Sequence, residues 1–321
     1  MKVYTLHHPH ELVKEELPKL SIALGFFDGV HRGHQKVIQT AVDYAAQHGL
    51  KSAVMTFEPH PSIVLSSKKD PVRLLSTLSQ KLEKIRHLGV DYVFVVRFTS
   101  AFAGLEPQQF VDQYLINLNV VHVTAGFDFS YGKMGRGKMD TLPFHSRNAF
   151  TSSIVEKQEL SDEKISSTRI RQLIGDGEVQ AAAELLGEEY VTEGSVIHGE
   201  KRGRKIGFPT ANISYDPVGM IPSPGVYAVQ LYVLGHWHDG VCNIGYKPTF
   251  NDPGSAALSV EVHLFDFSES IYGEEVIVKW IKRIRSEQKF DGIDSLVRQI
   301  SLDKESAIEL FRERKRSSDQ T

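Results

Sequence analysis

Two histidines near the start of the chain are spaced so that both can reach one phosphate group. His31 and His34 stand in GFFDGVHRGH (residues 25–34), between an apolar run and a stretch with helical periodicity. Residues three apart share one face at a helix start, where free N–H groups and partial positive charge suit phosphate. Two imidazoles there can stabilise charge that develops at an α-phosphorus. A zinc pair or two capping histidines are the alternatives, although no Cys or acidic residue has obvious zinc-ligand spacing.

A second phosphate-binding pattern follows in ISSTRIR (residues 165–171). Thr168 and Arg171 share one face of a helix that starts near Thr168, and an arginine can bind phosphate through two hydrogen bonds. The alternative is that the Ser and Thr hydroxyls only cap that helix. The pairing with residues 25–34 favours phosphate binding. No G-x-x-x-x-G-K-[ST] segment occurs, so the phosphate site is not a P-loop.

A basic, glycine-containing segment (residues 199–205) precedes GFPTAN (residues 207–212). Such a segment can wrap the phosphates of a nucleotide, and a solvated turn is its alternative. The Thr210 hydroxyl and the Asn212 carbonyl lie on the same side of an extended chain. Both are oxygen ligands of the kind that Mg²⁺ requires. With the basic segment before them they indicate a magnesium–nucleotide site, whereas GFPTAN by itself is more typical of a plain turn.

Glu261 is the candidate general base for this second site. It lies in SVEVHLF (residues 259–265), where alternation points Glu261, His263 and Phe265 to one face of a strand. A carboxylate among apolar and aromatic neighbours can accept the proton of an attacking hydroxyl. The alternative is a glutamate that faces solvent on an exposed sheet.

The first half of the chain carries the elements that position the histidines. Strand-like and helical segments alternate, which predicts a parallel sheet with helices on both faces. Ligands bind beyond the carboxyl ends of the strands in such sheets, and the Gly-, His- and Asp-rich segments lie there. We expect strands at residues 21–27, 52–57, 91–96 and 120–125 and helices at residues 33–48, 78–88 and 107–118.

The second half of the chain has a different pattern of secondary-structure elements. Closely spaced strands without intervening helices predict an antiparallel barrel or sandwich, followed by a terminal helix over residues 293–311. We place the domain boundary after residue 186, so that the domains are 1–186 and 187–321. The expected strands are residues 190–198, 226–234, 237–244, 258–265 and 276–284.

Composition bounds the class of protein. The 321 residues suggest about two domains, and a net charge of −3 disfavours a dedicated nucleic-acid binder. Cys242, the single cysteine, cannot form an intramolecular disulfide. The polar start lacks the apolar core of a signal peptide, and no apolar stretch is long enough to span a bilayer. We therefore expect a soluble, cytoplasmic protein that does not bind membranes. The composition leaves the oligomeric state open, and a monomer is the default expectation.

The N-terminal motifs resemble those of a known family. GFFDGVHRGH and ISSTRIR look like the two signatures of the HxGH nucleotidyltransferase superfamily, which has a Rossmann-like fold. TFEPHP (residues 56–61) and GFDFSYG (residues 126–132) make the set similar to the bacterial FAD synthetase module. The resemblance implies that ATP contacts Gly25, Phe26, Asp28, Gly29, His31, His34, Ser167, Thr168 and Arg171. It implies flavin contacts at His60, Pro61, Asp128 and Phe129.

The C-terminal motifs resemble the riboflavin kinase module. They are GFPTAN, PGVY (residues 224–227), NIG (residues 243–245), Pro248-Thr249, the EVH strand and Arg285 with Phe290. The resemblance implies that Mg²⁺ binds with ATP at Thr210 and Asn212, and that Glu261 activates the ribityl 5′-hydroxyl of riboflavin. The other implied ATP contacts are Gly199, Arg202, Gly203, Arg204, Gly207 and Pro209, and the implied flavin contacts are Arg285, Glu287 and Phe290.

The order and spacing of both modules are similar to the bacterial bifunctional riboflavin kinase/FAD synthetase family over almost the whole chain. The resemblance implies two ATP-dependent steps with the small-molecule substrates riboflavin, FMN and ATP. An adenylyltransferase for another phosphorylated metabolite with a degenerate barrel is one alternative. A non-catalytic flavin-binding or regulatory protein is the other. The presence of His31, His34, Thr210, Asn212 and Glu261 disfavours both alternatives.

Overall fold

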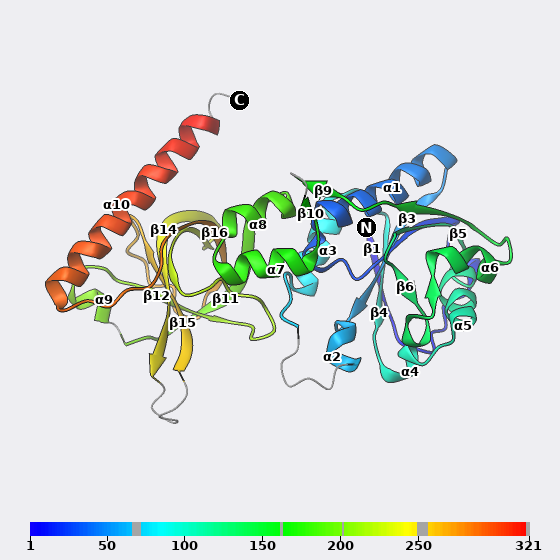
Figure 1. Cartoon of the computed structure of the whole chain (residues 1–321), viewed down its shortest axis with the longest axis horizontal. Helices are drawn as coiled ribbons and strands as arrows, with labels where there is room; N and C mark the ends of the chain where they lie inside the picture. Colours follow the sequence, from blue (N-terminus) through cyan, green and yellow to red (C-terminus); the bar gives the residue numbers. More distant parts are fainter. Residues whose placement is uncertain (66–71, 161–162, 201, 249–255, 319–321) are drawn as a thin grey trace. The chain divides into compact units, whose positions relative to one another are not determined.

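The chain folds as two compact units, Met1–Ser167 and Thr168–Thr321 (Figure 1). The computed structural model describes residues 1–65, 72–160, 163–200, 202–248 and 256–318. Helices α7 (Ser167–Asp176) and α8 (Val179–Leu186) fall almost entirely in the second unit. The domain boundary expected after residue 186 stays a prediction.

The first unit contains a six-stranded parallel sheet, as the alternation of elements predicts. Its strand order is β1-β4-β3-β2-β5-β8, and every pairing is parallel. The two edge strands were not anticipated, because both are only five residues long, mix polar with apolar residues and are largely exposed. The strands are β1 (Lys2–Leu6), β2 (Leu20–Leu24), β3 (Lys51–Glu58), β4 (Tyr92–Arg97), β5 (Val120–Gly126) and β8 (Thr151–Val155).

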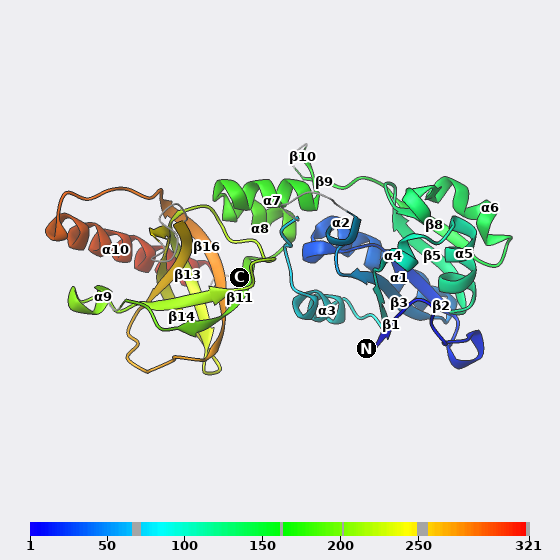
Figure 2. The same ribbon diagram turned by 90° about the horizontal axis from the view of Figure 1, so that it is seen from below.

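Helices cover both faces of this sheet (Figures 1 and 2). On one face, α1 (Arg32–His48) packs across β2, β3 and β5. It does so because Val37, Ile38 and Ala41 recur at helical spacing and are buried with residues of α3 (Leu78–His87). On the other face, α4 (Ser100–Ala103) and α5 (Pro107–Val111) contribute an aromatic core. The expected single helix 107–118 widens into a π-helical turn over Asp112–Ile116.

Short elements complete the first unit. The helical ones are η1 (Lys14–Glu16), η2 (Asp28–Val30), α2 (Pro61–Leu65), η4 (Lys133–Gly135), η5 (Met139–Thr141) and α6 (Leu142–Ser146). The strands are β6 (Ser130–Tyr131), β7 (Gly137–Lys138), β9 (Glu159–Leu160) and β10 (Glu163–Lys164). Residues 25–30, 59–60 and 127–129 directly follow β2, β3 and β5, so they meet at the carboxyl edge of the sheet where α/β proteins bind ligands.

The second unit contains a closed antiparallel barrel, which confirms the expected antiparallel architecture. The strand order is β11-β12-β15-β14-β13-β16. Trp280 and Tyr227 are fully buried in it with their rings edge to face. The strands are β11 (Tyr190–Ile197), β12 (Ala211–Tyr215), β13 (Gly225–Val233), β14 (His236–Pro248), β15 (Ala256–Leu264) and β16 (Glu275–Arg285).

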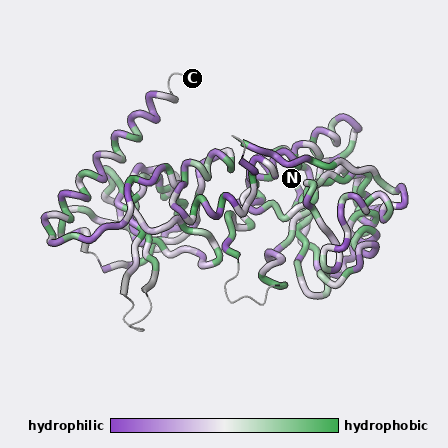
Figure 3. The backbone as a smooth tube through the Cα atoms, viewed as in Figure 1, coloured by the Kyte–Doolittle hydropathy of each residue, from purple (hydrophilic) through white to green (hydrophobic). Residues whose placement is uncertain are grey.

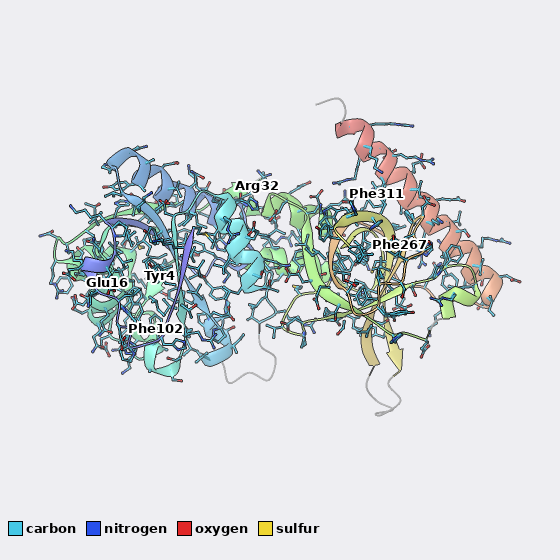
Figure 4. All side chains as sticks on the ribbon, turned by 180° about the vertical axis from the view of Figure 1, so that it is seen from behind. Tyr4, Glu16, Arg32, Phe102, Phe267 and Phe311 are labelled. Carbon is cyan, nitrogen blue, oxygen red and sulfur yellow. The ribbon has the colours of Figure 1, made fainter. Side chains whose placement is uncertain are left out.

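The terminal helix α10 (Ile293–Ser318) packs on the outside of the barrel. Its residues Ala307 and Phe311 are buried against Ala228 and Ile281, as the labelled Phe311 illustrates (Figure 4). Hydrophobic and hydrophilic residues alternate along α10 in Figure 3, which is typical of a helix with one buried face. A short helix, α9 (Arg202–Lys205), lies within the basic segment. Among the described residues, no helix combines the length and apolar character needed to cross a membrane.

Candidate active sites

The loop after β2 adopts an unusual backbone conformation. Phe27, Gly29 and Val30 all have positive φ, at 55°, 80° and 48°. This region favours glycine, and a β-branched residue such as Val30 costs on the order of 1–3 kcal/mol there. The surrounding hydrogen bonds therefore have to hold the loop. The carboxylate of Asp28, which is 2% exposed, accepts hydrogen bonds from the backbone N–H groups of Leu75 and Ser76.

The two histidines lie together at the start of α1. Their rings stack with centroids 3.6 Å apart, and the His31 side chain is 4% exposed. His31 caps the helix, because its Nδ1 accepts the backbone N–H of His34 at 3.2 Å. An Nδ1 that accepts is unprotonated, so the neutral ring carries its proton on Nε2. The His31 side chain therefore does cap the helix, and its ring proton lies on Nε2.

The zinc alternative requires further metal ligands beside the two histidines. The described residues contain no group of three or more His, Cys, Asp or Glu side chains arranged to hold a metal ion. A structural zinc site normally takes four such ligands.

The second phosphate pattern spans residue 167, the last residue of the first compact unit in the sequence. Ser167 Oγ donates to the Asp28 carbonyl at 3.1 Å, so the start of ISSTRIR contacts the loop after β2. Thr168 and Arg171 occupy the first turn of α7, where Thr168 is exposed and Arg171 is half-buried. Both belong to the second unit. That they approach the phosphates beside the two histidines therefore stays a prediction.

The expected flavin contacts of the first unit lie near the carboxyl ends of β3 and β5. The His60 ring meets the Phe26 ring edge on, with centroids 4.1 Å apart, and Pro61 begins α2. Asp128 is exposed, and the Phe129 ring stacks on Tyr131 at 6.3 Å. Because β2 lies between β3 and β5, these segments flank the loop of residues 25–30.

The second constellation comes together on two neighbouring strands of the barrel. Asn212 of β12 lies opposite Glu261 of β15 in the antiparallel register. Thr210, just before β12, donates its hydroxyl hydrogen to Glu261 Oε2 at 3.1 Å. A Cβ at Gly199 would collide with the Asn212 amide, so the glycine is needed for this close approach. Gly199, Thr210, Asn212 and Glu261 therefore form one cluster.

The remaining residues of the basic segment are only partly described. Gly203 accepts the Phe208 N–H at 2.9 Å, which folds the segment back onto GFPTAN, and Gly207 has a φ of 87°. Arg204 is exposed. Lys201 and the side chain of Arg202 lie outside the described residues, as does Thr249.

A pocket of about 460 Å³ opens beside Thr210. Sequence reasoning identified only Arg204, Pro209 and Thr210 among its lining residues. It missed the segment 267–272, in which Phe267 is labelled in Figure 4, because a turn-rich loop after a strand carries no distinctive spacing. The Tyr272 ring stacks on His198 at 4.1 Å. The lining residues are Val196, Arg204, Pro209, Thr210, Ala211, Val262, Leu264, Phe267, Ser268, Glu269, Ser270, Ile271 and Tyr272.

His263 holds the GFPTAN segment from the strand that carries Glu261. Its Nδ1 lies 2.8 Å from the Pro209 carbonyl oxygen. Because a carbonyl only accepts, Nδ1 carries the proton. The side chain is 8% exposed, and burial lowers its pKa, so the neutral ring is favoured. Sequence alternation placed His263 on the face of Glu261 but gave no sign of this hydrogen bond.

Replacing His263 by alanine removes the hydrogen bond to Pro209, so Thr210, the next residue, can shift relative to Glu261. The rate of the reaction at Glu261 should then fall about tenfold. Asparagine places a donor near the position of Nδ1, so His263→Asn should retain most of the rate. The two variants are compared in a steady-state assay of that reaction. Equal losses in both variants would show that the hydrogen bond to Pro209 does not matter.

The residues of the second unit that are expected to contact flavin interact with the terminal helix and with each other. Arg285 forms a two-point ion pair with Asp303 of α10, with N–O distances of 2.8 and 2.9 Å. The guanidinium also lies 5.7 Å from the centre of the Phe290 ring. Glu287 is exposed and comes close to the backbone at Gly245. Arg285 thus anchors the segment that contains Glu287 and Phe290 to the terminal helix.

Comparisons with known proteins agree with this architecture. Residues 13–169 match a family model described as FAD synthetase, and residues 186–311 match one described as riboflavin kinase. A Bacillus subtilis protein named bifunctional riboflavin kinase/FMN adenylyltransferase is 51% identical over 97% of this chain and 98% of its own length. Proteins of the same name from Listeria monocytogenes and Escherichia coli are 50% and 37% identical, over 97% and 94% of this chain and 98% and 96% of their own.

A solved structure also resembles the whole chain. A crystal structure described as a macrolide-efflux protein from Streptococcus pneumoniae is 34% identical in sequence and has a TM-score of 0.84. It covers 94% of this chain and 97% of its own. The arrangement of elements in this chain is therefore shared by an experimentally determined structure.

Proposed function

The chain belongs to the bifunctional riboflavin kinase/FMN adenylyltransferase family, and from this premise we propose which residues carry out each reaction. The kinase phosphorylates riboflavin with ATP to give FMN, and the adenylyltransferase joins FMN and AMP to give FAD. The assignment of the kinase residues rests above all on the contact between Thr210 and Glu261. A hydroxyl and a carboxylate 3.1 Å apart, on a strand pair that also carries Asn212, are suited to phosphoryl transfer.

Glu261 is the general base of the kinase. Its carboxylate accepts the proton of the riboflavin 5′-hydroxyl as that oxygen attacks the γ-phosphorus of ATP. The bond between the γ-phosphorus and the bridging oxygen breaks, and ADP leaves with the electron pair. The Thr210 hydroxyl, which donates to Oε2, orients the carboxylate for this step.

The donor set beside Glu261 fits Mg²⁺. Thr210 and Asn212 offer a hydroxyl and an amide oxygen, and Mg²⁺ prefers oxygen ligands. Thr210 and Asn212 would hold Mg²⁺ beside Glu261, and the ion would there supply positive charge to the phosphates of ATP.

The pocket beside Thr210 receives the nucleoside of ATP. Its volume of about 460 Å³ lies within the usual range for small-molecule sites. Its walls combine apolar side chains with the aromatic rings of Phe267 and Tyr272, which suit a planar base. The segment 199–207 covers the phosphates, including Gly199, Arg202, Gly203, Arg204 and Gly207, and Pro209 lines the pocket. Arg285, Glu287 and Phe290 border the flavin.

The loop of residues 25–34 binds ATP for the adenylyl transfer. The FMN phosphate attacks the α-phosphorus directly and pyrophosphate leaves, so positioning and electrostatic stabilisation dominate. His31 and His34 donate hydrogen bonds to the phosphates, and Ser167, Thr168 and Arg171 hold them as well. Gly25, Phe26, Asp28 and Gly29 shape the loop. The flavin of FMN contacts His60, Pro61, Asp128 and Phe129, and Mg²⁺ accompanies this ATP too.

Chromatography of the products from riboflavin, ATP and Mg²⁺ tests the proposal with the full chain. We expect FMN and FAD, and no product when a chelator removes Mg²⁺. Conversion of supplied FMN without any use of riboflavin would indicate a degenerate barrel, and unconverted flavins would indicate a non-catalytic flavin-binding protein. Either of these results would contradict the assignment. The monomeric state and the cytoplasmic location stay proposals alongside it.

A further inference from the structure

A short segment before and within α3 holds the loop of residues 25–30 from behind. Besides the two backbone N–H groups that donate to Asp28, the Ser76 hydroxyl oxygen accepts the N–H of Gly29 at 3.0 Å. Lys84 Nζ donates to the Gly29 carbonyl at 3.2 Å. Lys81 Nζ donates to the Phe26 carbonyl at 2.9 Å. The backbone with positive φ is thus fixed by hydrogen bonds to residues 75–84.

Lys81 is the unusual member of this set, because its side chain is only 2% exposed. Its ammonium lies 4.0 Å from the centre of the Phe26 ring and 3.4 Å from Thr56 Oγ1. Lysine is almost never buried to this extent without a charged partner. The charged groups that act on it are Asp28 in the loop and Glu58 at the end of β3. Lys84 lies one turn further along α3, and the His60 ring packs on the same Phe26 ring.

The buried charge opposes folding. Burial lowers the pKa of Lys81 to about 8, although Asp28 and Glu58 favour the charged form. The folded-state pKa is thus below the unfolded value of 10.5. The unfolded chain therefore binds more protons between those two values, and the free energy of unfolding rises with pH across this window. Below pH 8 the full cost of the buried charge is present. If this side chain only packed against apolar neighbours, a methionine would do so without the cost of a buried charge.

The hydrogen bond to Phe26 has a geometric consequence for the loop. A trans peptide directs its N–H opposite to its C=O. By holding the Phe26 carbonyl towards α3, Lys81 fixes the direction of the next N–H, that of Phe27. Thr56 Oγ1 also donates to this carbonyl, at 2.8 Å, so the oxygen keeps a donor if Lys81 is replaced. Loss of Lys81 therefore removes a charge and one of the two hydrogen bonds that orient this carbonyl, without leaving the buried oxygen unpaired.

We propose that Lys81 is a positioning residue of the adenylyl transfer: its ammonium fixes the loop that carries Phe26 and Phe27 and adds positive charge behind the phosphate-binding loop. Phosphate oxygens and the charge that develops on them are the groups that such a field stabilises. This inference rests on the proposed role of residues 25–34 in binding ATP. Lys81 acts through the loop and needs no contact with the substrate.

The test compares full-length Lys81→Met and Lys81→Arg with Arg86→Met, which removes an exposed cation from the same helix. We expect Lys81→Met to lower kcat/KM for FMN adenylylation by about 10- to 100-fold, the cost of a small misplacement. Its Tm at pH 7 should be equal to or above that of the wild type. Lys81→Arg keeps the charge and should recover part of the rate. Arg86→Met should be unchanged, as should riboflavin phosphorylation in all three variants.

The pH profile separates a positioning role from a purely structural one. Wild-type adenylylation should decline as pH rises through about 8, where Lys81 loses its proton. This decline should be missing from Lys81→Met and from the kinase reaction. Adenylylation by Lys81→Met within twofold of wild type would overturn the inference. So would a parallel loss of Tm and both activities that Lys81→Arg does not relieve. Normal adenylylation by a His31 variant would instead reject the proposed site itself.

Discussion

Replacing Glu261 by glutamine is expected to stop FMN formation while leaving the conversion of supplied FMN to FAD intact. Glutamine has the shape of glutamate and an oxygen that can still accept the Thr210 hydroxyl hydrogen, so the strand pair should be preserved. What is lost is the carboxylate that accepts the proton of the ribityl hydroxyl. General base catalysis contributes about 10²- to 10⁴-fold, and kcat for riboflavin phosphorylation should fall by that factor. Each half-reaction is measured separately by chromatography.

Glu275→Gln is the matched control, because Glu275 is an exposed glutamate on another strand of the same barrel, β16. It should leave both half-reactions unchanged. If Glu261→Gln phosphorylates riboflavin at the wild-type rate, Glu261 is not the base. If it loses FAD formation from supplied FMN as well, the assignment of Glu261 to the kinase alone is wrong.

Replacing His31 by asparagine should cause FMN to accumulate. Asparagine is a good helix cap, so the start of α1 is retained, whereas the imidazole Nε2–H donor is lost. Removal of one donor to a charge that develops in the transition state typically costs about 10²- to 10³-fold in kcat. The rate of FAD formation from FMN should fall by this factor, and riboflavin phosphorylation should not change. The Tm should remain within about 2 °C of wild type, since the cap is kept.

The same substitution at His48 controls for this experiment. His48 is an exposed residue in the last turn of α1, far along the helix from the loop. His48→Asn should make FAD normally. Normal FAD formation by His31→Asn would show that the imidazole only caps the helix, which is the alternative that the hydrogen bond to His34 leaves open.

Strong periodicity made most of the fold predictable. The apolar residues of α1 recur every three or four positions, and the runs at β3 and β4 are almost wholly buried. The strands β1, β8 and β12 were missed for a physical reason. Edge strands such as β1 and β8 face solvent and carry no dense apolar run. The strand β12 has only five residues, and it starts inside the GFPTAN segment. The antiparallel register of β12 and β15 places Asn212 opposite Glu261. The spacing of these two residues along the chain does not indicate that they are neighbours.

The reactive residues were more predictable than the residues that support them. His31, Thr210 and Glu261 stand in segments whose residue types and spacing already indicate chemistry. Two of the supporting residues, Lys81 and His263, contact residues about 55 positions away along the chain. A third, Tyr272, lines the pocket from a separate loop. A lysine inside an amphipathic helix is normally a surface residue, so only its burial in the structure distinguishes Lys81.

The central claim is that one chain holds two separate active sites that act in sequence. The most direct measurement mixes equal amounts of His31→Asn and Glu261→Gln with riboflavin, ATP and Mg²⁺ and follows FAD. Neither variant alone should make FAD from riboflavin, whereas the mixture should, because FMN released by the first variant is adenylylated by the second. If FMN accumulates in the mixture and no FAD forms, or if either variant alone makes FAD from riboflavin, the two-site account is contradicted.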